Sequence, residues 1–329
     1  MIVADAVRVW DAALSAISSC LRDRGLRQIQ TPPVVDEVAL EPWIEPLGLA
    51  GRFVQTSPEL TMKRLLADGA GATFQLAAVA RRGEHGQWHR EQFVLLEWYR
   101  DAPTLAAVRA DAEAVIAAVA EALAPWRRAD APVPTRWRSI AWLDALAQHT
   151  QLVLRGDEDG DALVHACRSR LPLPPLRAAT PQARTLEAWT ALFTALCDQA
   201  LDAWLAARAA DGEGVHVIEF PAPLAALSEH ERDGSGRAVA ARFESHGFGR
   251  ELCNGYRELR DGVEQRRRFE AVAQLRDAVG LPVLPMPERF LALLEQARLP
   301  PCAGAAMGVD RLVALACGAD SLDAIALVR

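Results

Sequence analysis

Two glutamates seven residues apart, Glu251 and Glu258, flank an Asn-Gly dipeptide in the segment "RELCNGYREL". On a regular strand an odd separation sends two side chains to opposite faces, so both acids could not serve one site. A β-bulge at Asn254-Gly255 would add one residue and turn both carboxylates into the same cavity. The segment equally fits a polar edge strand with a solvated hairpin turn, and these residues alone leave both interpretations open.

A third acid, Glu244, precedes Glu251 by seven residues across the turn-forming sequence "SHGFGR". A hairpin with a tight loop would place residues 244 and 251 opposite each other, roughly 5 Å apart at Cβ. Three converging carboxylates repel one another unless a cation lies among them. A divalent metal ion or an ammonium group would meet that requirement.

Two arginines suggest what else the site binds. Arg81 ends a strand-like run, and Arg311 follows small residues in "GAAMGVDRL". Guanidinium groups suit phosphate oxygens because they donate in a bidentate manner. Acids, a metal and two arginines together indicate Mg²⁺-ATP, although each arginine alone also fits a surface ion pair.

The elements that must position these residues alternate between helical and strand-like patterns. We expect helices at 4–24, 57–69, 104–124 and 263–280, a hairpin over 240–259, and a glycine-rich strand running into a helix at the end. The runs "ATFQLAAVAR" and "EQFVLLEWYR" predict an antiparallel strand pair with a long connection, and "GVHVIEF" predicts another strand. This is an α+β layout: one domain over 1–329, with a largely antiparallel sheet flanked by helices and a helical insertion at 125–215.

Composition narrows the class of protein. The chain has 329 residues, 51% hydrophobic and 24% charged, with a net charge of −7 that disfavours a broad nucleic-acid footprint. There is no signal-peptide pattern and no uncharged run of 18 apolar residues, so we expect no membrane association. The six cysteines include no C-x-x-C pair, which favours free thiols in the cytoplasm over a zinc site.

The order of the segments resembles the catalytic core of class II lysyl-tRNA synthetases, and most of all the elongation factor P lysyltransferase family. The resemblance rests on "RGLRQIQTPPVV", "TSPELTMKRLL", "FQLAAVAR", "HREQFVLLEWYR", "RELCNGYREL" and "GAAMGVDRL", and covers the chain except roughly 125–210. The first core motif begins at residue 24, so we expect the synthetases' N-terminal anticodon-binding barrel to be absent.

The resemblance implies a class II aminoacyl-tRNA synthetase fold and an ATP-dependent ligase. Such an enzyme would activate lysine or β-lysine as an adenylate, with ATP and Mg²⁺, and transfer it to a lysine of elongation factor P rather than to tRNA. It also implies a homodimer paired through about residues 5–35, although the apolar stripe Val7, Trp10, Leu14 and Ile17 equally fits an intramolecular core.

Carried over position by position, the resemblance implies three groups of site residues. The catalytic group is Arg81, Glu251 and Arg311, and the magnesium ligands are Glu244 and Glu251. The ATP-binding group is Arg81, Arg82, Gly83, Glu84, His89, Arg90, Phe93, Glu244, Ser245, Gly308 and Arg311. The amino-acid-binding group is Ser57, Pro58, Glu59, Glu97, Tyr99, Glu251, Asn254, Glu258 and Ala306. Alanine at 306 replaces a synthetase glycine, a difference associated with preference for β-lysine.

The chain departs from the family in the nucleotide loop. It reads Ala-Arg-Arg-Gly-Glu at 80–84 where the family reads Phe-Arg-Asn-Glu-Glu, so the acid expected at 83 is missing. It also reads His-Arg-Glu-Gln-Phe at 89–93 in place of His-Asn-Pro-Glu-Phe. Two alternatives therefore stay open: adenylation with transfer to another acceptor, such as a carrier protein or small molecule, and a catalytically weak paralogue that binds an amino acid.

Overall fold

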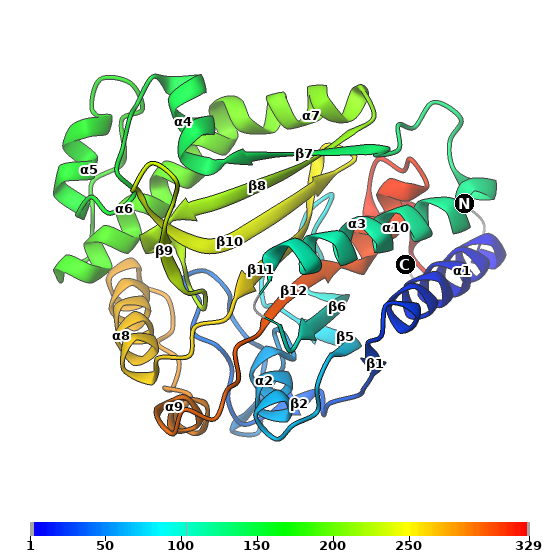
Figure 1. The fold of residues 1–329 in the computed structure, drawn as a ribbon, viewed down its shortest axis with the longest axis horizontal. Coiled ribbons are helices and arrows are strands. Elements are labelled where there is room, and N and C mark those ends of the chain that lie inside the picture. The colour runs from blue at the N-terminus through cyan, green and yellow to red at the C-terminus, as the bar shows by residue number, and fades with distance from the viewer. Residues whose placement is uncertain (1–2, 103, 328–329) are drawn as a thin grey trace.

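The computed structural model describes residues 3–102 and 104–327, and a mixed sheet runs through its centre (Figure 1). Within those residues the strands of this sheet are β1 (Arg27–Gln28), β5 (Thr73–Ala80), β6 (Gln92–Arg100), β7 (Arg136–Ala141), β8 (Glu213–Pro221), β9 (His230–Arg232), β10 (Ala238–Gly247), β11 (Arg250–Arg257) and β12 (Ala303–Gly308). Their order is β1-β5-β6-β12-β11-β10-β8-β7, with β9 beside β10. The β1–β5 and β7–β8 pairs are parallel, and the other pairs are antiparallel.

Helices flank the sheet, and a small second sheet lies beside it. The helices are α1 (Val3–Asp23), α2 (Glu59–Ala67), α3 (Leu105–Ala122), α4 (Trp142–Thr150), α5 (Gly160–Cys167), α6 (Pro181–Leu196), α7 (Asp202–Ala210), α8 (Gly262–Val279), α9 (Glu288–Glu295) and α10 (Val309–Ala316). The small sheet consists of β2 (Val34–Val35), β4 (Arg52–Val54) and β3 (Gly48–Leu49). The predicted α+β layout is confirmed, including the β5–β6 pair, the β10–β11 hairpin and the run of β12 into α10.

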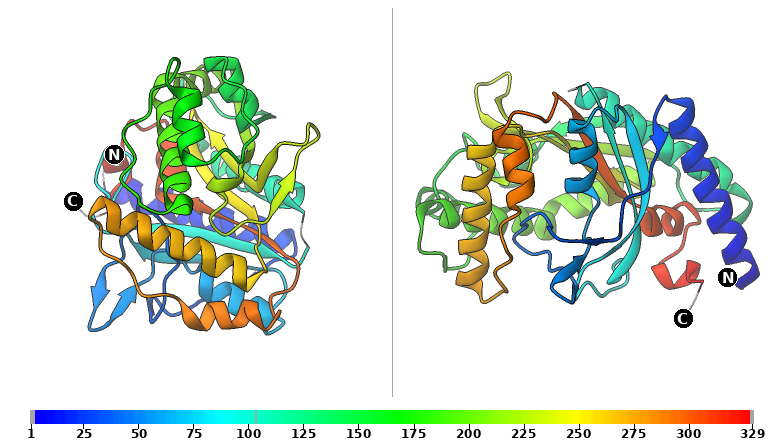
Figure 2. Two further views of the ribbon diagram at one scale, coloured as in Figure 1. Left: turned by 90° about the vertical axis from the view of Figure 1, so that its left-hand side faces the viewer. Right: turned by 90° about the horizontal axis from the view of Figure 1, so that it is seen from below.

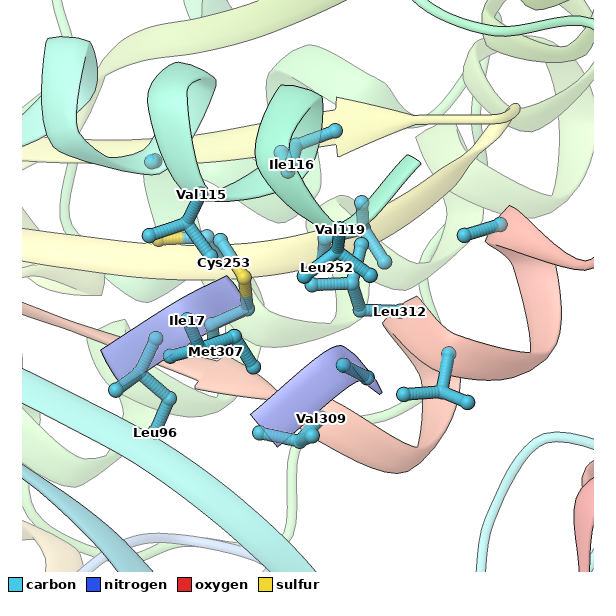
Figure 3. Packing of buried hydrophobic residues seen from close by; sticks show 14 of the residues in the cluster. Ile17, Leu96, Val115, Ile116, Val119, Leu252, Cys253, Met307, Val309 and Leu312 are labelled. Carbon is cyan, nitrogen blue, oxygen red and sulfur yellow. The ribbon is translucent and has the colours of Figure 1, made fainter. Parts of the chain in front are cut away.

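Helices α1, α3 and α10 cover one face of the sheet. Figure 3 shows side chains of α1, α3 and α10, including Ile17, Val115 and Leu312, packed with Met307 and Cys253 of the sheet. All five are fully or almost fully buried. Because a strand alternates its side chains, the residues between these core positions point to the opposite face, where a site can form.

The stripe expected on α1 divides between core and surface. Ile17 is buried, and the Trp10 indole nitrogen donates a hydrogen bond to the Ile325 carbonyl, 2.9 Å away. Val7, by contrast, is 53% exposed. The inner part of the stripe therefore packs within the chain, while its outer end is open to solvent.

The segment between 125 and 215 is mostly helical and carries its own core. It holds α4 to α7, whose buried Trp142 and Trp189 pack with Phe220 of β8. It also contributes strand β7, and β8 begins at Glu213 inside it, so the segment is continuous with the central sheet. In Figure 2 its helices stand beside α8 at one end of the molecule. Among the described helices, none is long and apolar enough to cross a membrane.

Candidate active site

The register of the antiparallel strands gathers the expected amino-acid-binding residues into rows. Glu97 of β6 lies opposite Ala306 of β12, which lies opposite Asn254 of β11, which in turn lies opposite Glu244 of β10. Residues directly opposite one another project from the same face of a sheet. Four positions far apart in the sequence therefore line up in one row.

A second row lies two residues further along each strand. It runs from Tyr99 through Gly304 and Tyr256 to Arg242. A side chain at Gly304 would place its Cβ 2.3 Å from the Tyr99 ring, so only glycine lets this ring lie across β12. The row ends in a connected polar group, because Arg242 donates to the Asn254 side-chain oxygen at 3.1 Å and Asn254 donates to the Tyr256 hydroxyl at 2.7 Å.

The bulge expected on β11 exists, but it is not at Asn254-Gly255. Ser245 pairs with Cys253 while His246 pairs with Glu251, so Leu252 is the additional residue on the strand. The Asn-Gly pair continues a regular ladder with β12. Glycine is needed at 255 because a Cβ there would lie 2.4 Å from the Phe243 ring on the covered face. The bulge still brings Glu251 to the face of Asn254, and both line one cavity.

Two further expectations about this hairpin need correction. Its two-residue turn at Phe248 and Gly249, both with positive φ, pairs Glu251 with His246 rather than with Glu244. Ser245, expected at ATP, points to the covered face, where it lies 2.9 Å from a ring nitrogen of His216. It is fully buried, because odd and even positions of β10 face opposite ways.

A cavity of about 240 Å³ holds most of the expected nucleotide-binding residues. Arg81, Glu84, His89, Arg90, Phe93, Glu251, Asn254, Ala306, Gly308 and Arg311 all line it. The Arg81 guanidinium lies over the Phe93 ring, 5.2 Å from its centroid. Arg311 donates to the Glu251 carbonyl at 2.7 Å and to a ring nitrogen of His89 at 2.9 Å. Burial and the nearby Arg311 lower the pKa of His89, so its ring is neutral and accepts this bond.

Of three expected ATP-binding residues in the loop between β5 and β6, Arg82, Gly83 and Glu84, only Glu84 lines the small cavity. Arg82 pairs with Glu45 at 3.3 Å and is mostly exposed, and Gly83 donates its backbone N–H to Glu91 at 2.8 Å. Neither lines the cavity, in contrast to what the resemblance implies. Glu84 does line it and lies 3.7 Å from Arg81. Glu84 is therefore the acid of this loop that can meet a bound base.

Glu97, at one end of the first row, is a buried carboxyl group. The Ser57 hydroxyl donates to Glu97 at 2.6 Å, and the Tyr99 hydroxyl donates to its other oxygen at 2.6 Å. Ser57 also accepts the backbone N–H of Glu59 at 3.0 Å, while Pro58 occupies the N-cap position of α2 and lines neither the 240 Å³ cavity nor the larger one described below. Burial and the neighbouring Glu59 raise the pKa of Glu97 to about 8, against the opposing effect of the two hydroxyls.

The other two expected acids share a partner that the sequence analysis missed. The Lys63 ammonium lies 2.5 Å from a carboxylate oxygen of Glu59 and 2.5 Å from one of Glu258, and all three side chains are buried. Glu59 and Lys63 are four residues apart, which places them on one face of α2. Two signals were available: this spacing, and the fact that Lys63 is the only lysine in the chain.

Comparison with known proteins agrees with this geometry. The family model for class II tRNA synthetases (D, K and N) matches residues 3–328. The chain belongs to the class II tRNA synthetase family. It is 32% identical over 328 residues to the elongation factor P–(R)-β-lysine ligase of Photorhabdus laumondii, covering 94% of this chain and 90% of that protein. The corresponding ligase of Klebsiella pneumoniae is 33% identical over 330 residues with the same coverage.

Of the two magnesium ligands that the resemblance implies, Glu244 and Glu251, only Glu251 lines the small cavity. Glu251 is 43% exposed at its side chain, and its nearest cationic group is Arg311 at 3.7 Å. Glu244 is already paired with Arg242 at 2.6 Å and does not line the cavity. Within the described residues no three His, Cys, Asp or Glu side chains group as a metal site. Magnesium commonly binds through one or two carboxylates plus phosphate oxygens and water, so Glu251 fits and Glu244 fits only if it leaves Arg242.

A second, larger cavity of this class II domain lies next to the small one. Its volume is about 940 Å³, and its walls come from the sheet, from α6 and from α8. Arg242, Asn254 and Tyr256 are among the sheet residues that line it. The two cavities share two lining residues, Asn254 and Glu41, and Glu41 is not part of any motif found in the sequence.

Proposed function

We propose that this chain is an ATP-dependent ligase that activates lysine or (R)-β-lysine as an adenylate and transfers it to a lysine of elongation factor P. The named activity of its relatives supports this function. The observation that carries the proposal is the row Glu97–Ala306–Asn254, which joins buried acids to the cavity of Arg81 and Arg311 on one face of the sheet.

The charges of the buried acid cluster, Glu59, Glu97 and Glu258, suit a doubly cationic amino acid. When ionised, Glu59, Glu97 and Glu258 carry three negative charges, and Lys63 balances one of them. The remaining two match two ammonium groups, whereas an amino acid with an acidic side chain would meet uncompensated repulsion. Ala306 lies opposite Glu97 and, with Asn254, lines the nucleotide cavity, so the carboxyl group of the amino acid would lie against these two residues.

Adenylation needs charge neutralisation and positioning more than an acid or a base. Arg81 would hold the α-phosphate, Arg311 the γ-phosphate, and Phe93 would stack on adenine; all three line the small cavity. Glu251, with Glu244 as a second candidate, would hold Mg²⁺, which would offset phosphate charge. The amino-acid carboxylate attacks the α-phosphate, the bond to the β-phosphate oxygen breaks, and pyrophosphate leaves.

The proposal also covers the location of the protein, its oligomeric state and its lack of activity on tRNA. The protein works in the cytoplasm as a homodimer, with the exposed end of α1 near Val7 at the interface. It does not charge tRNA, because a net charge of −7 disfavours binding of a phosphate backbone. Sedimentation at micromolar concentration and charging assays with tRNA-Lys test these statements directly.

The decisive experiment measures the two half-reactions separately. Amino-acid-dependent pyrophosphate exchange with lysine, (R)-β-lysine and the other common amino acids tests activation. Mass spectrometry of elongation factor P after incubation with ATP and the best amino acid tests transfer. Since the only lysine of the enzyme is buried, modified lysine in this assay comes from the acceptor. Exchange without transfer would point to another acceptor, and no exchange with any amino acid would refute the ligase.

A further inference from the structure

Glu41 lies where the two cavities meet. It belongs to the loop between β2 and β3, and together with Asn254 it lines both the 240 Å³ cavity and the 940 Å³ cavity. Among the described residues, its carboxylate takes part in no hydrogen bond and no ion pair. The two acids that interact with it differ in this respect: Glu59 pairs with Lys63 at 2.5 Å, and Glu84 lies 3.7 Å from Arg81.

The backbone of the loop that carries Glu41 is held by hydrogen bonds from Arg276. Arg276 of α8 is fully buried, and one of its nitrogens donates to the carbonyls of Glu41 and Ile44, each at 2.9 Å, and to that of Pro42 at 3.3 Å. Arginine donors so placed hold the backbone in one conformation. Glu41 is thus held at the junction by a buried contact, although the loop has no regular secondary structure.

We propose that Glu41 is the proton acceptor of the transfer step, in which an acceptor amine arriving through the large cavity attacks the acyl-adenylate formed beside the small one. The inference rests on the proposed function, because it requires an adenylate and an amine acceptor. Glu41 is the unpaired carboxylate at the one place that faces both the nucleotide cavity and the route left for a second substrate.

The transfer step forms one bond to the acyl carbon and breaks one. The neutral lysine amine of the acceptor forms a bond to the acyl carbon, and its nitrogen becomes positively charged. Glu41 takes one proton from that nitrogen, the bond between the acyl carbon and the phosphate oxygen breaks, and AMP leaves with the electron pair. The product is an amide, and Glu41 later loses its proton to solvent.

The surroundings of Glu41 suit this role. Burial raises the pKa of Glu41, while Arg81 and Arg242 oppose the shift and Glu59 and Glu84 add to it. Arg276 of α8 and Tyr256 of β11 also interact electrostatically with this carboxylate. A carboxylate whose pKa is moved toward neutrality is a better proton acceptor at physiological pH than an ordinary one.

The test is Glu41→Gln, which keeps the shape of the side chain but cannot take a proton. Pyrophosphate exchange should stay within about twofold of wild type, and trapping of the adenylate with hydroxylamine should persist. Single-turnover transfer to elongation factor P should fall by about 100-fold or more, the usual contribution of a general base. Glu41→Asp should recover part of the rate, and the rise of the transfer rate with pH should vanish in Glu41→Gln alone.

Glu45→Gln is the matched control, because Glu45 lies on the same loop but pairs with Arg82. Unchanged transfer in Glu41→Gln would overturn the inference. So would an equal fall in exchange and transfer, since that result would make Glu41 a binding residue for the amino acid or ATP. Failure of the proposed function is a separate outcome, because wild type itself would then lack exchange or transfer.

Discussion

The ammonium nitrogen of Lys63 lies 2.5 Å from a carboxylate oxygen of Glu258, and each of the two side chains is only 1% exposed. The same nitrogen lies 2.5 Å from Glu59. The two flanking carboxylates raise the pKa of Lys63, so it keeps its charge, whereas burial raises the pKa of Glu258. The chain thus keeps an internal ammonium group among the acids that are proposed to bind the ammonium groups of a substrate.

Removing Lys63 should destabilise the protein strongly. Lys63→Met leaves Glu59 and Glu258 buried without a counter-charge, and breaking a buried ion pair in this way typically costs about 3–5 kcal/mol. In Lys63→Met/Glu258→Gln, part of this loss should be recovered relative to the sum of the single variants. Denaturant unfolding of all four proteins should give a coupling free energy of about 1–3 kcal/mol. Additive effects of the two changes would contradict a direct interaction.

Glu258→Gln and Glu251→Gln should separate the two ends of the site. Glu258→Gln should raise the Michaelis constant for the lysine-type amino acid by about 100-fold, because a buried charge that faces an ammonium group is lost. Its ATP affinity, measured by calorimetry, should stay unchanged, since Glu258 does not line the nucleotide cavity. Glu251→Gln should weaken ATP binding as well. Equal and mild effects of both changes would disprove the assignment of the two acids.

Binding of the amino acid should release a proton at neutral pH. The pKa of Glu97 is raised to about 8 by burial and Glu59, so the free enzyme is mostly protonated there at pH 7, and a bound ammonium group favours ionisation. Affinity should therefore rise by up to tenfold per pH unit between about pH 6 and 8. The protonated carboxyl group stabilises the fold below its unfolded pKa of about 4.5, and this contribution is lost as pH rises through 8.

Titration calorimetry at pH 7 in phosphate and in Tris measures that release, because the two buffers differ in ionisation enthalpy. Identical binding enthalpies in both buffers would rule it out. Ser57→Ala removes a hydroxyl that favours the ionised form of Glu97. This variant should therefore shift the pH profile of affinity to higher pH.

Glu84 should set the preference for ATP over GTP. It is the acid of the β5–β6 loop that lines the small cavity, and it can accept a hydrogen bond from the adenine amino group. Glu84→Ala, which removes the acceptor, should raise the Michaelis constant for ATP by about 3- to 10-fold, the value of one such bond, while that for GTP stays the same. Equal changes for both nucleotides would argue against base recognition by Glu84.

Placing an acid at position 83, by Gly83→Glu, should not restore recognition of the adenine amino group. Gly83 has a φ of 76°, and a side chain there costs about 1–2 kcal/mol of backbone strain. We therefore expect Gly83→Glu to destabilise the loop rather than sharpen the preference for ATP. Pyrophosphate exchange with ATP and GTP at limiting nucleotide measures this outcome alongside Glu84→Ala.

The sequence by itself determined the fold class, the family and most of the residues near the cavities. Helix ends at Gly25 and Gly69, the β5–β6 pair and the "SHGFGR" turn are local features, set by residues within a few positions of one another. The ordered segments such as "TSPELTMKRLL" and "GAAMGVDRL" carried the family, because each keeps the residue types that its part of the fold requires.

The tertiary structure alone decided which side chains face one another. The bulge at Leu252 rather than Asn254-Gly255, and the turning of Ser245 to the covered face, follow from pairing between strands, where a shift of one residue reverses every side chain. The contact of Lys63 with Glu258 joins positions almost 200 residues apart in the sequence. The hydrogen bond from Arg276 to the Glu41 carbonyl joins positions 235 residues apart. Such contacts depend on packing of the whole chain, so no local pattern can specify them.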